Sequence, residues 1–185
     1  MIGKKNIVFG FLYLVLTASL GPYMVVELLP TVSEAQLLKQ QDVGPLQLLA
    51  ENDFEDENTM APISAKQLAM ANTKGILALN QLVNANAPID SMKGGPHAHG
   101  NLEAVLNILA GLVLCFLAAP VLVKQLISWL FIAGALLHSG SLYLLAFDMA
   151  WAGTLLQIGP WLVLLALLTA GISSLIWLQT EPVRD

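Results

Sequence analysis

The chain has 185 residues, of which 56% are hydrophobic and 11% are charged, and its formal net charge at pH 7 is −5. With a mean hydropathy of +0.70, it has the composition of an integral membrane protein. Its sequence contains no basic patch of the kind that binds nucleic acid, and its single cysteine, Cys115, excludes a disulfide framework.

Four apolar segments are long enough to cross a bilayer, at roughly residues 6–29, 102–121, 125–147 and 151–178. The predicted fold is therefore an all-α integral membrane bundle of four transmembrane helices, with a long outer loop that contains one or two short helices. Residues 1–29 are predicted to form the first transmembrane helix, residues 30–100 an extracytoplasmic loop or helical insertion, and residues 101–185 the remaining three transmembrane helices.

The first apolar segment follows Lys4 and Lys5 and continues well past a small-residue site at residues 17–19. This length favours an uncleaved anchor over a cleaved signal peptide. If four helices alternate across the membrane, both lysines fall on the same side as Lys124 and Arg184. Basic residues mark the cytoplasmic side, so we expect a multi-pass protein of a bacterial inner membrane with both termini in the cytoplasm.

The outer segment contains two capping-box patterns, at residues 33–36 and 64–67, each predicting the start of a helix. The second helix is expected to end near Asn84. Pro88 and the Gly-Gly-Pro sequence at residues 94–96 are expected to break the chain before the next transmembrane helix.

Five of the seven residues at 51–57 are acidic. This run predicts a solvated loop. A loop that binds a cation or a partner is the alternative, although the spacing does not match an EF-hand.

A polar face descends the second transmembrane segment. His99, Glu103 and Asn107 are spaced four residues apart, so they project from one side of a helix. An ionisable group beside hydrocarbon is a candidate functional residue. The alternative is a purely structural one, in which Glu103 caps the helix N-terminus and Asn107 forms a hydrogen bond below it.

Imidazole and carboxylate side chains near one membrane face indicate a metal site. Imidazole suits copper, zinc and iron. The candidate ligands are His97, His99, Glu103 and Glu27, the last at the outer end of the first segment. On a regular helix, however, two residues two positions apart point about 200° from each other. A shared ion at His97 and His99 therefore requires non-helical backbone at residues 96–99.

His138 lies near the middle of the third segment, where a histidine is either buried against other helices or functional. With His99 it forms the candidate ligand pair for a haem. His138 lies about ten residues from Asp148, hence roughly 15 Å below the outer surface. His99 is expected at that surface, so the two histidines meet only if the second helix begins deeper than its hydropathy indicates.

The Phe-Leu-Tyr-Leu sequence at residues 11–14, the H-x-H-x-N pattern from His97 to Asn101, and His138 together resemble small membrane proteins related to the catalytic subunits of haem–copper oxidases and nitric-oxide reductases. The resemblance implies at most one haem or metal and no oxygen reduction, because this chain has only three histidines.

The expected function is that of a small membrane protein that binds a metal or haem as a subunit of a membrane redox complex. Haem and copper are the candidate cofactors, and the bilayer and other membrane subunits the expected partners. We expect no catalysis by the chain alone. A non-catalytic accessory or assembly subunit without a cofactor is the alternative. A transporter with Glu103 and His138 as a proton relay is a third class, which no repeat or pair of broken helices supports.

Overall fold

A computed structural model of the chain describes residues 1–55 and 60–183. Within these ranges the secondary structure is helical apart from two isolated bridges. Four helices are long and apolar enough to cross a membrane: Gly3–Glu51, Ala65–Phe116, Val121–Ala146 and Ala150–Trp177. They confirm the predicted all-α class and fit a multi-pass membrane protein. The chain divides into two compact units, one of Met1–Pro22 with Ser91–Asp185 and one of Tyr23–Asp90.

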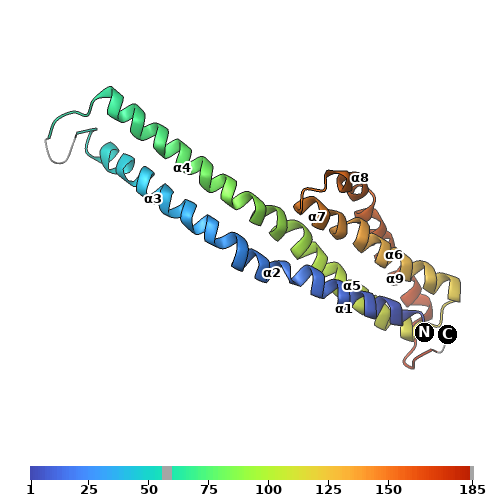
Figure 1. The fold of residues 1–185 in the computed structure, drawn as a ribbon. Helices are drawn as coiled ribbons and strands as arrows, with labels where there is room; N and C mark the ends of the chain where they lie inside the picture. Colours follow the sequence, from blue (N-terminus) through green and yellow to red (C-terminus); the bar gives the residue numbers. More distant parts are fainter. Residues whose placement is uncertain (56–59, 184–185) are drawn as a thin grey trace. The chain divides into compact units, whose positions relative to one another are not determined.

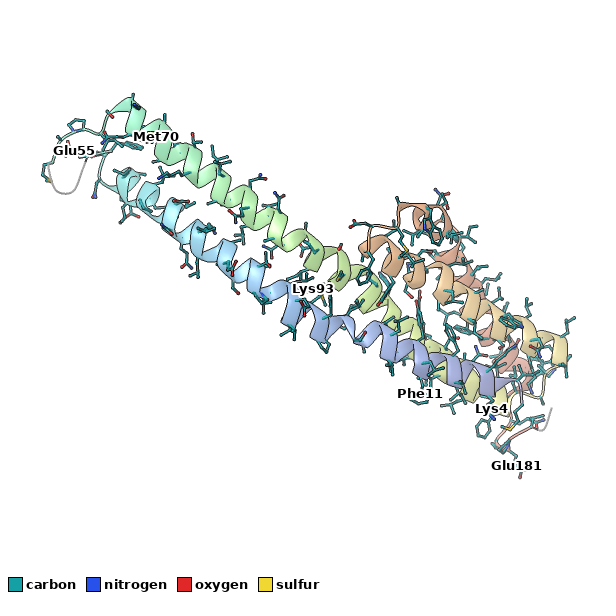
Figure 2. The ribbon with its side chains drawn as sticks, in the orientation of Figure 1. Lys4, Phe11, Glu55, Met70, Lys93 and Glu181 are labelled. Carbon is teal, nitrogen blue, oxygen red and sulfur yellow. The ribbon has the colours of Figure 1, made fainter. Side chains whose placement is uncertain are left out.

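The first unit is built on two helices that pack antiparallel, α1 (Gly3–Ala18) and α5 (Gly100–Phe116) (Figure 1). Glycines let the two backbones approach closely. A Cβ added to Gly10 would lie 2.6 Å from the carbonyl oxygen of Ala104, and one added to Gly111 would lie 2.6 Å from the carbonyl oxygen of Gly3. The buried residues of α1 recur every three or four positions, as in a coiled-coil seam; they are Gly3, Asn6, Gly10, Tyr13 and Thr17. The opposite face of α1 carries Phe11, which points away from α5 (Figure 2).

Two further long helices complete this unit, α6 (Val121–Leu137) and α9 (Gly159–Trp177), which pack against each other. The predicted third transmembrane helix is interrupted at His138, whose φ of −96° and ψ of −85° lie outside the helical region. The chain then forms α7 (Ser139–Ala146), the 3-10 turn η3 (Ala150–Ala152) and the short α8 (Gly153–Leu156).

Pro160 lies in the first turn of α9 and does not interrupt that helix. A proline is tolerated there, since the first helical N–H groups have no partner within the helix. The preceding Gly159 brings the start of α9 against the break between α6 and α7. A Cβ on this glycine would lie 2.3 Å from the backbone nitrogen of His138.

The α5–α6 turn and the residues after α9 lie together at one end of the first unit. The backbone nitrogen of Ala118 donates to the carbonyl of Trp177 at 2.9 Å, and that of Val183 donates to the carbonyl of Cys115 at 2.8 Å. Lys5, near the start of α1, donates to the side chain of Gln125 in α6. Lys4, Lys5 and Lys124 thus lie at the same end of this unit, as the alternation of four helices predicts. Figure 2 labels Lys4 there. Arg184 lies outside the described residues.

The second unit is a helical hairpin. Residues of α2 (Leu20–Tyr23) up to Pro22 still belong to the first unit. The second unit begins with the π-helical turn η1 (Met24–Leu28) and consists mainly of α3 (Leu29–Glu51) and α4 (Ala65–Met92), which lie side by side (Figure 1). The capping box at Ser64 is confirmed: the backbone nitrogen of Gln67 donates to Ser64 Oγ at 3.2 Å, and Ser64 N donates to Gln67 Oε1 at 3.0 Å. The acidic run begins at the end of α3, and its last two residues, 56 and 57, lie outside the described part of the chain.

Three sequence expectations for the segment from 30 to 100 are wrong. No helix starts at Ser33, whose hydroxyl donates to the carbonyl of Leu29 inside α3. Pro88 lies within α4 and does not end it. The Gly-Gly-Pro sequence lies in a π-helical segment, η2 (Lys93–His99), that leads directly into α5. A π-helical turn shifts the hydrogen-bond register, so a proline without an N–H is accommodated while the backbone stays helical.

Candidate functional site

Glu103 is a buried carboxylate in the middle of the first unit, with only 4% of its surface exposed. Its Oε1 lies 2.5 Å from Nδ1 of His138. Its Oε2 accepts a hydrogen bond from the Ser139 hydroxyl at 2.5 Å and a longer one from the Ser139 backbone nitrogen at 3.4 Å. Burying a carboxylate is costly unless it is paired and hydrogen-bonded. Both oxygens of Glu103 have such partners.

The helix break at His138 supplies these partners. The break ends α6 and starts α7 at Ser139, whose N–H, in the first turn of α7, has no acceptor within that helix. This N–H and the Ser139 hydroxyl both point to Glu103 on α5. The interruption that the hydropathy pattern does not reveal is therefore what turns two donors and an imidazole toward one carboxylate.

A tyrosine of α1 extends this group of side chains. The hydroxyl of Tyr13 lies 2.8 Å from that of Ser139 and donates to the carbonyl of Ala135 at 3.3 Å. We refer to Tyr13, Glu103, His138 and Ser139 as the carboxylate cluster. It joins α1, α5 and the α6–α7 junction through hydrogen bonds inside a largely apolar unit.

The structure brings His99 next to this cluster. The ring centroids of His99 and His138 lie 4.9 Å apart, with the ring planes tilted by 51°. The expected separation of His99 from His138 is therefore wrong. The helix does not start at this residue, because η2 and α4 continue it on the N-terminal side. The candidate pair His99 and His138 meets, with His99 exposed and the side chain of His138 16% exposed.

His97 points elsewhere. Its Nδ1 lies 3.1 Å from the carbonyl oxygen of Thr17 and 3.5 Å from the side-chain nitrogen of Asn101. Thr17 in turn donates to Asn101 at 2.8 Å. Because the backbone of residues 93–99 is helical, His97 and His99 lie on different faces and do not form the shared site considered from the sequence.

Of the predicted metal ligands, the structure brings His99 and Glu103 to the same region, one helical turn apart. Glu27 lies in η1, which belongs to the second unit. In the part of the chain that the structure describes, no three His, Cys, Asp or Glu side chains are arranged to hold a metal ion.

A second polar layer lies one to two turns away along α1 and α5. Asn6 donates from Nδ2 to Asn107 Oδ1 and to the carbonyl of Ser128, both at 3.1 Å, and accepts from the Ser128 hydroxyl. Asn107 donates to the carbonyl oxygens of Glu103 at 3.0 Å and Phe131 at 3.2 Å. Of the three residues predicted to share a face, Glu103 and Asn107 are both buried on α5, whereas His99 is exposed.

Sequence reasoning missed Asn6 and Ser139 and assigned no role to Tyr13. The signal for Asn6 and Tyr13 is the heptad-like spacing of small and polar residues in the first apolar segment. No comparable signal marks Ser139, because its role depends on the break at His138.

Comparisons of the chain with protein families, with curated proteins and with solved structures find no match. The resemblance of the H-x-H-x-N pattern to the relatives of haem–copper oxidases stays a prediction. The function is therefore argued from the geometry of the site.

Proposed function

We propose that the protein is a small membrane protein that binds one transition-metal ion or metal-containing group through His99 and His138, as a subunit of a membrane redox complex. The observation that carries the proposal is the arrangement of His138. Glu103 holds one nitrogen of its ring at 2.5 Å while the ring of His99 lies 4.9 Å away.

A carboxylate on the second nitrogen of a histidine is a common support for metal binding. In the proposed metal-binding state, the Glu103 carboxylate accepts a hydrogen bond from Nδ1 of His138, which leaves the lone pair of Nε2 for a metal. In this proposal Glu103 orients His138 and is not itself a ligand, because Ser139 occupies its other oxygen.

The separation of the two rings supports a single ion. Metal–imidazole bonds are about 2.0–2.1 Å long, which puts two coordinating nitrogens roughly 3–4 Å apart. Ring centroids 4.9 Å apart are compatible with that spacing. A bare ion such as copper fits this separation more directly than a haem, whose plane would have to lie between the rings. Two histidines leave coordination positions open, and a partner subunit or an exogenous ligand would fill them.

A second candidate function is that of an accessory subunit without a cofactor. The observation in its favour is that the polar atoms of Tyr13, Glu103 and Ser139 form hydrogen bonds with one another or with the backbone. In hydrocarbon, such bonds together with small residues hold helices to each other. The cluster would then serve only to join α1, α5 and α7.

An absorption spectrum and an elemental analysis of the purified full chain separate the two functions. The metal-binding proposal predicts about one equivalent of copper, zinc or iron per chain, or a Soret band if the group is a haem. If the protein contains none of these metals and shows no Soret band, even after incubation with each ion, the metal-binding proposal is wrong and the accessory function is favoured.

A further inference from the structure

A groove of about 620 Å³ lies between α1 and α6, at the end of the first unit that carries the lysines. Lys4 and Lys5 line it at the start of α1. Val8 and Phe9 follow one helical turn further along, and Ile132 lines it from α6. The groove thus passes from cationic to apolar along the direction of a candidate membrane-spanning helix.

Lys5 is held in place at this groove. Its Nζ donates to Gln125 Oε1 at 2.5 Å and lies 4.3 Å from the centroid of the Trp129 ring. Trp129 also lines the groove, and tryptophan is typical of the membrane–water interface. Neither Lys4 nor Lys5 forms an ion pair with a carboxylate among the described residues. Two cationic groups therefore lie beside an apolar groove without a counter-anion from these parts of the chain.

We propose that this groove binds one anionic phospholipid, with its phosphate at Lys4 and Lys5 and an acyl chain along Val8, Phe9 and Ile132. Basic pockets between transmembrane helices bind anionic lipid headgroups. A free phosphate ion would satisfy the lysines but leave the apolar wall uncovered. A zwitterionic lipid brings its own ammonium group close to the lysines. An anionic lipid matches both parts of the groove.

The site is separate from the two histidines. It lies at the start of α1, whereas Tyr13, further along that helix, contacts Ser139, the residue that follows His138. Lipid binding at the lysines and metal binding at the histidines can thus succeed or fail independently.

The test is native mass spectrometry of the full chain, purified in detergent and mixed with equal amounts of phosphatidylglycerol and phosphatidylcholine. It measures the preference of the protein for the anionic lipid. Each lysine is expected to contribute about fivefold to the preference for the anionic lipid, since a cationic residue near an anionic lipid surface is worth about 1 kcal/mol. The variant Lys4→Gln/Lys5→Gln should have a preference for the anionic lipid about thirtyfold lower than that of the wild type. The matched control Lys66→Gln/Lys74→Gln, with both lysines exposed on α4, should keep the wild-type preference.

Three further measurements separate the lipid from a simple anion and from a folding defect. Val8→Trp leaves both lysines in place and fills the apolar wall, so it should reduce retention of phosphatidylglycerol. Lys4→Gln alone changes an exposed residue, so it should not disturb folding. It should still lower the preference for the anionic lipid about fivefold. Thermal stabilisation by inorganic phosphate equal to that by phosphatidylglycerol would overturn the proposal. An absent lipid preference in the wild type, or a preference that survives Lys4→Gln/Lys5→Gln, would overturn it as well.

Discussion

Glu103 and His138 lie 35 residues apart in the chain, yet their side chains meet at 2.5 Å between helices that are apolar enough to cross a membrane. The contact joins α5 to the break between α6 and α7. Burying an ionisable pair in such surroundings is costly unless its polar atoms form hydrogen bonds, and here Glu103 forms them with both His138 and Ser139.

Replacing Glu103 with alanine is expected to destabilise the protein by about 1–3 kcal/mol, because His138 and Ser139 lose their shared acceptor. Glu103→Gln should cost less, since its amide oxygen still accepts from Ser139 although its amide nitrogen cannot accept from His138. Thermal unfolding in detergent, followed by circular dichroism, measures both. Glu34→Ala, at an exposed position on α3, serves as the control. A Glu103→Ala protein that melts with the wild type would show that the pair does not stabilise the fold.

The two hydroxyl groups of the carboxylate cluster are expected to contribute unequally to the stability of the protein. Ser139 contacts Glu103, Tyr13 and the carbonyl of Ala135, whereas the hydroxyl of Tyr13 contacts only Ser139 and Ala135. Ser139→Ala should therefore lower stability more than Tyr13→Phe, for which we expect about 0.6 kcal/mol, the average for a hydrogen bond between membrane helices. The same unfolding assay measures the order, and the reverse order would contradict the assigned hydrogen bonds.

The close approach of α1 and α5 predicts that Gly10→Ala is destabilising, by about 1–3 kcal/mol, because the new methyl group meets the backbone of Ala104 at 2.6 Å. Gly171→Ala in α9 is the matched control, since a Cβ there has no neighbour within 4 Å among the described residues. It should be neutral or slightly stabilising, because alanine favours a helix more than glycine does. Equal effects of the two substitutions would contradict the packing of α1 on α5.

Periodicity and capping patterns predict the features of the structure that depend on residues close together in the sequence. The four apolar helices, the Ser64 cap and the common face of Glu103 and Asn107 follow from such patterns. The meeting of His99 with His138 does not, because it depends on two departures from a regular α-helix. One is the π-helical backbone of η2, which continues the helix through Pro96. The other is the break at His138, for which the surrounding apolar sequence gives no sign.

The spacing of α1 places Tyr13 on a buried face, but the contacts of Tyr13 and Ser139 with the rest of the carboxylate cluster could not be predicted from the sequence. Tyr13 lies in α1 and Ser139 follows the break, and each is an unremarkable packing residue when only its own segment is considered. Their roles arise from tertiary packing, with α1 approaching α5 through its glycines and α9 approaching His138 at Gly159.

The central claim is that His99 and His138 together bind a metal. Its most direct test is a copper(I) titration of the purified protein in competition with a chromophoric chelator, repeated with zinc. His97→Ala is the matched control, because this histidine lies two residues from His99 and faces Thr17. Wild type and His97→Ala should bind one equivalent. His99→Ala and His138→Ala should each bind at least about tenfold more weakly, and Glu103→Gln should lie between them and the wild type. Equal binding by all three histidine variants, or no stoichiometric binding by the wild type, would contradict the claim.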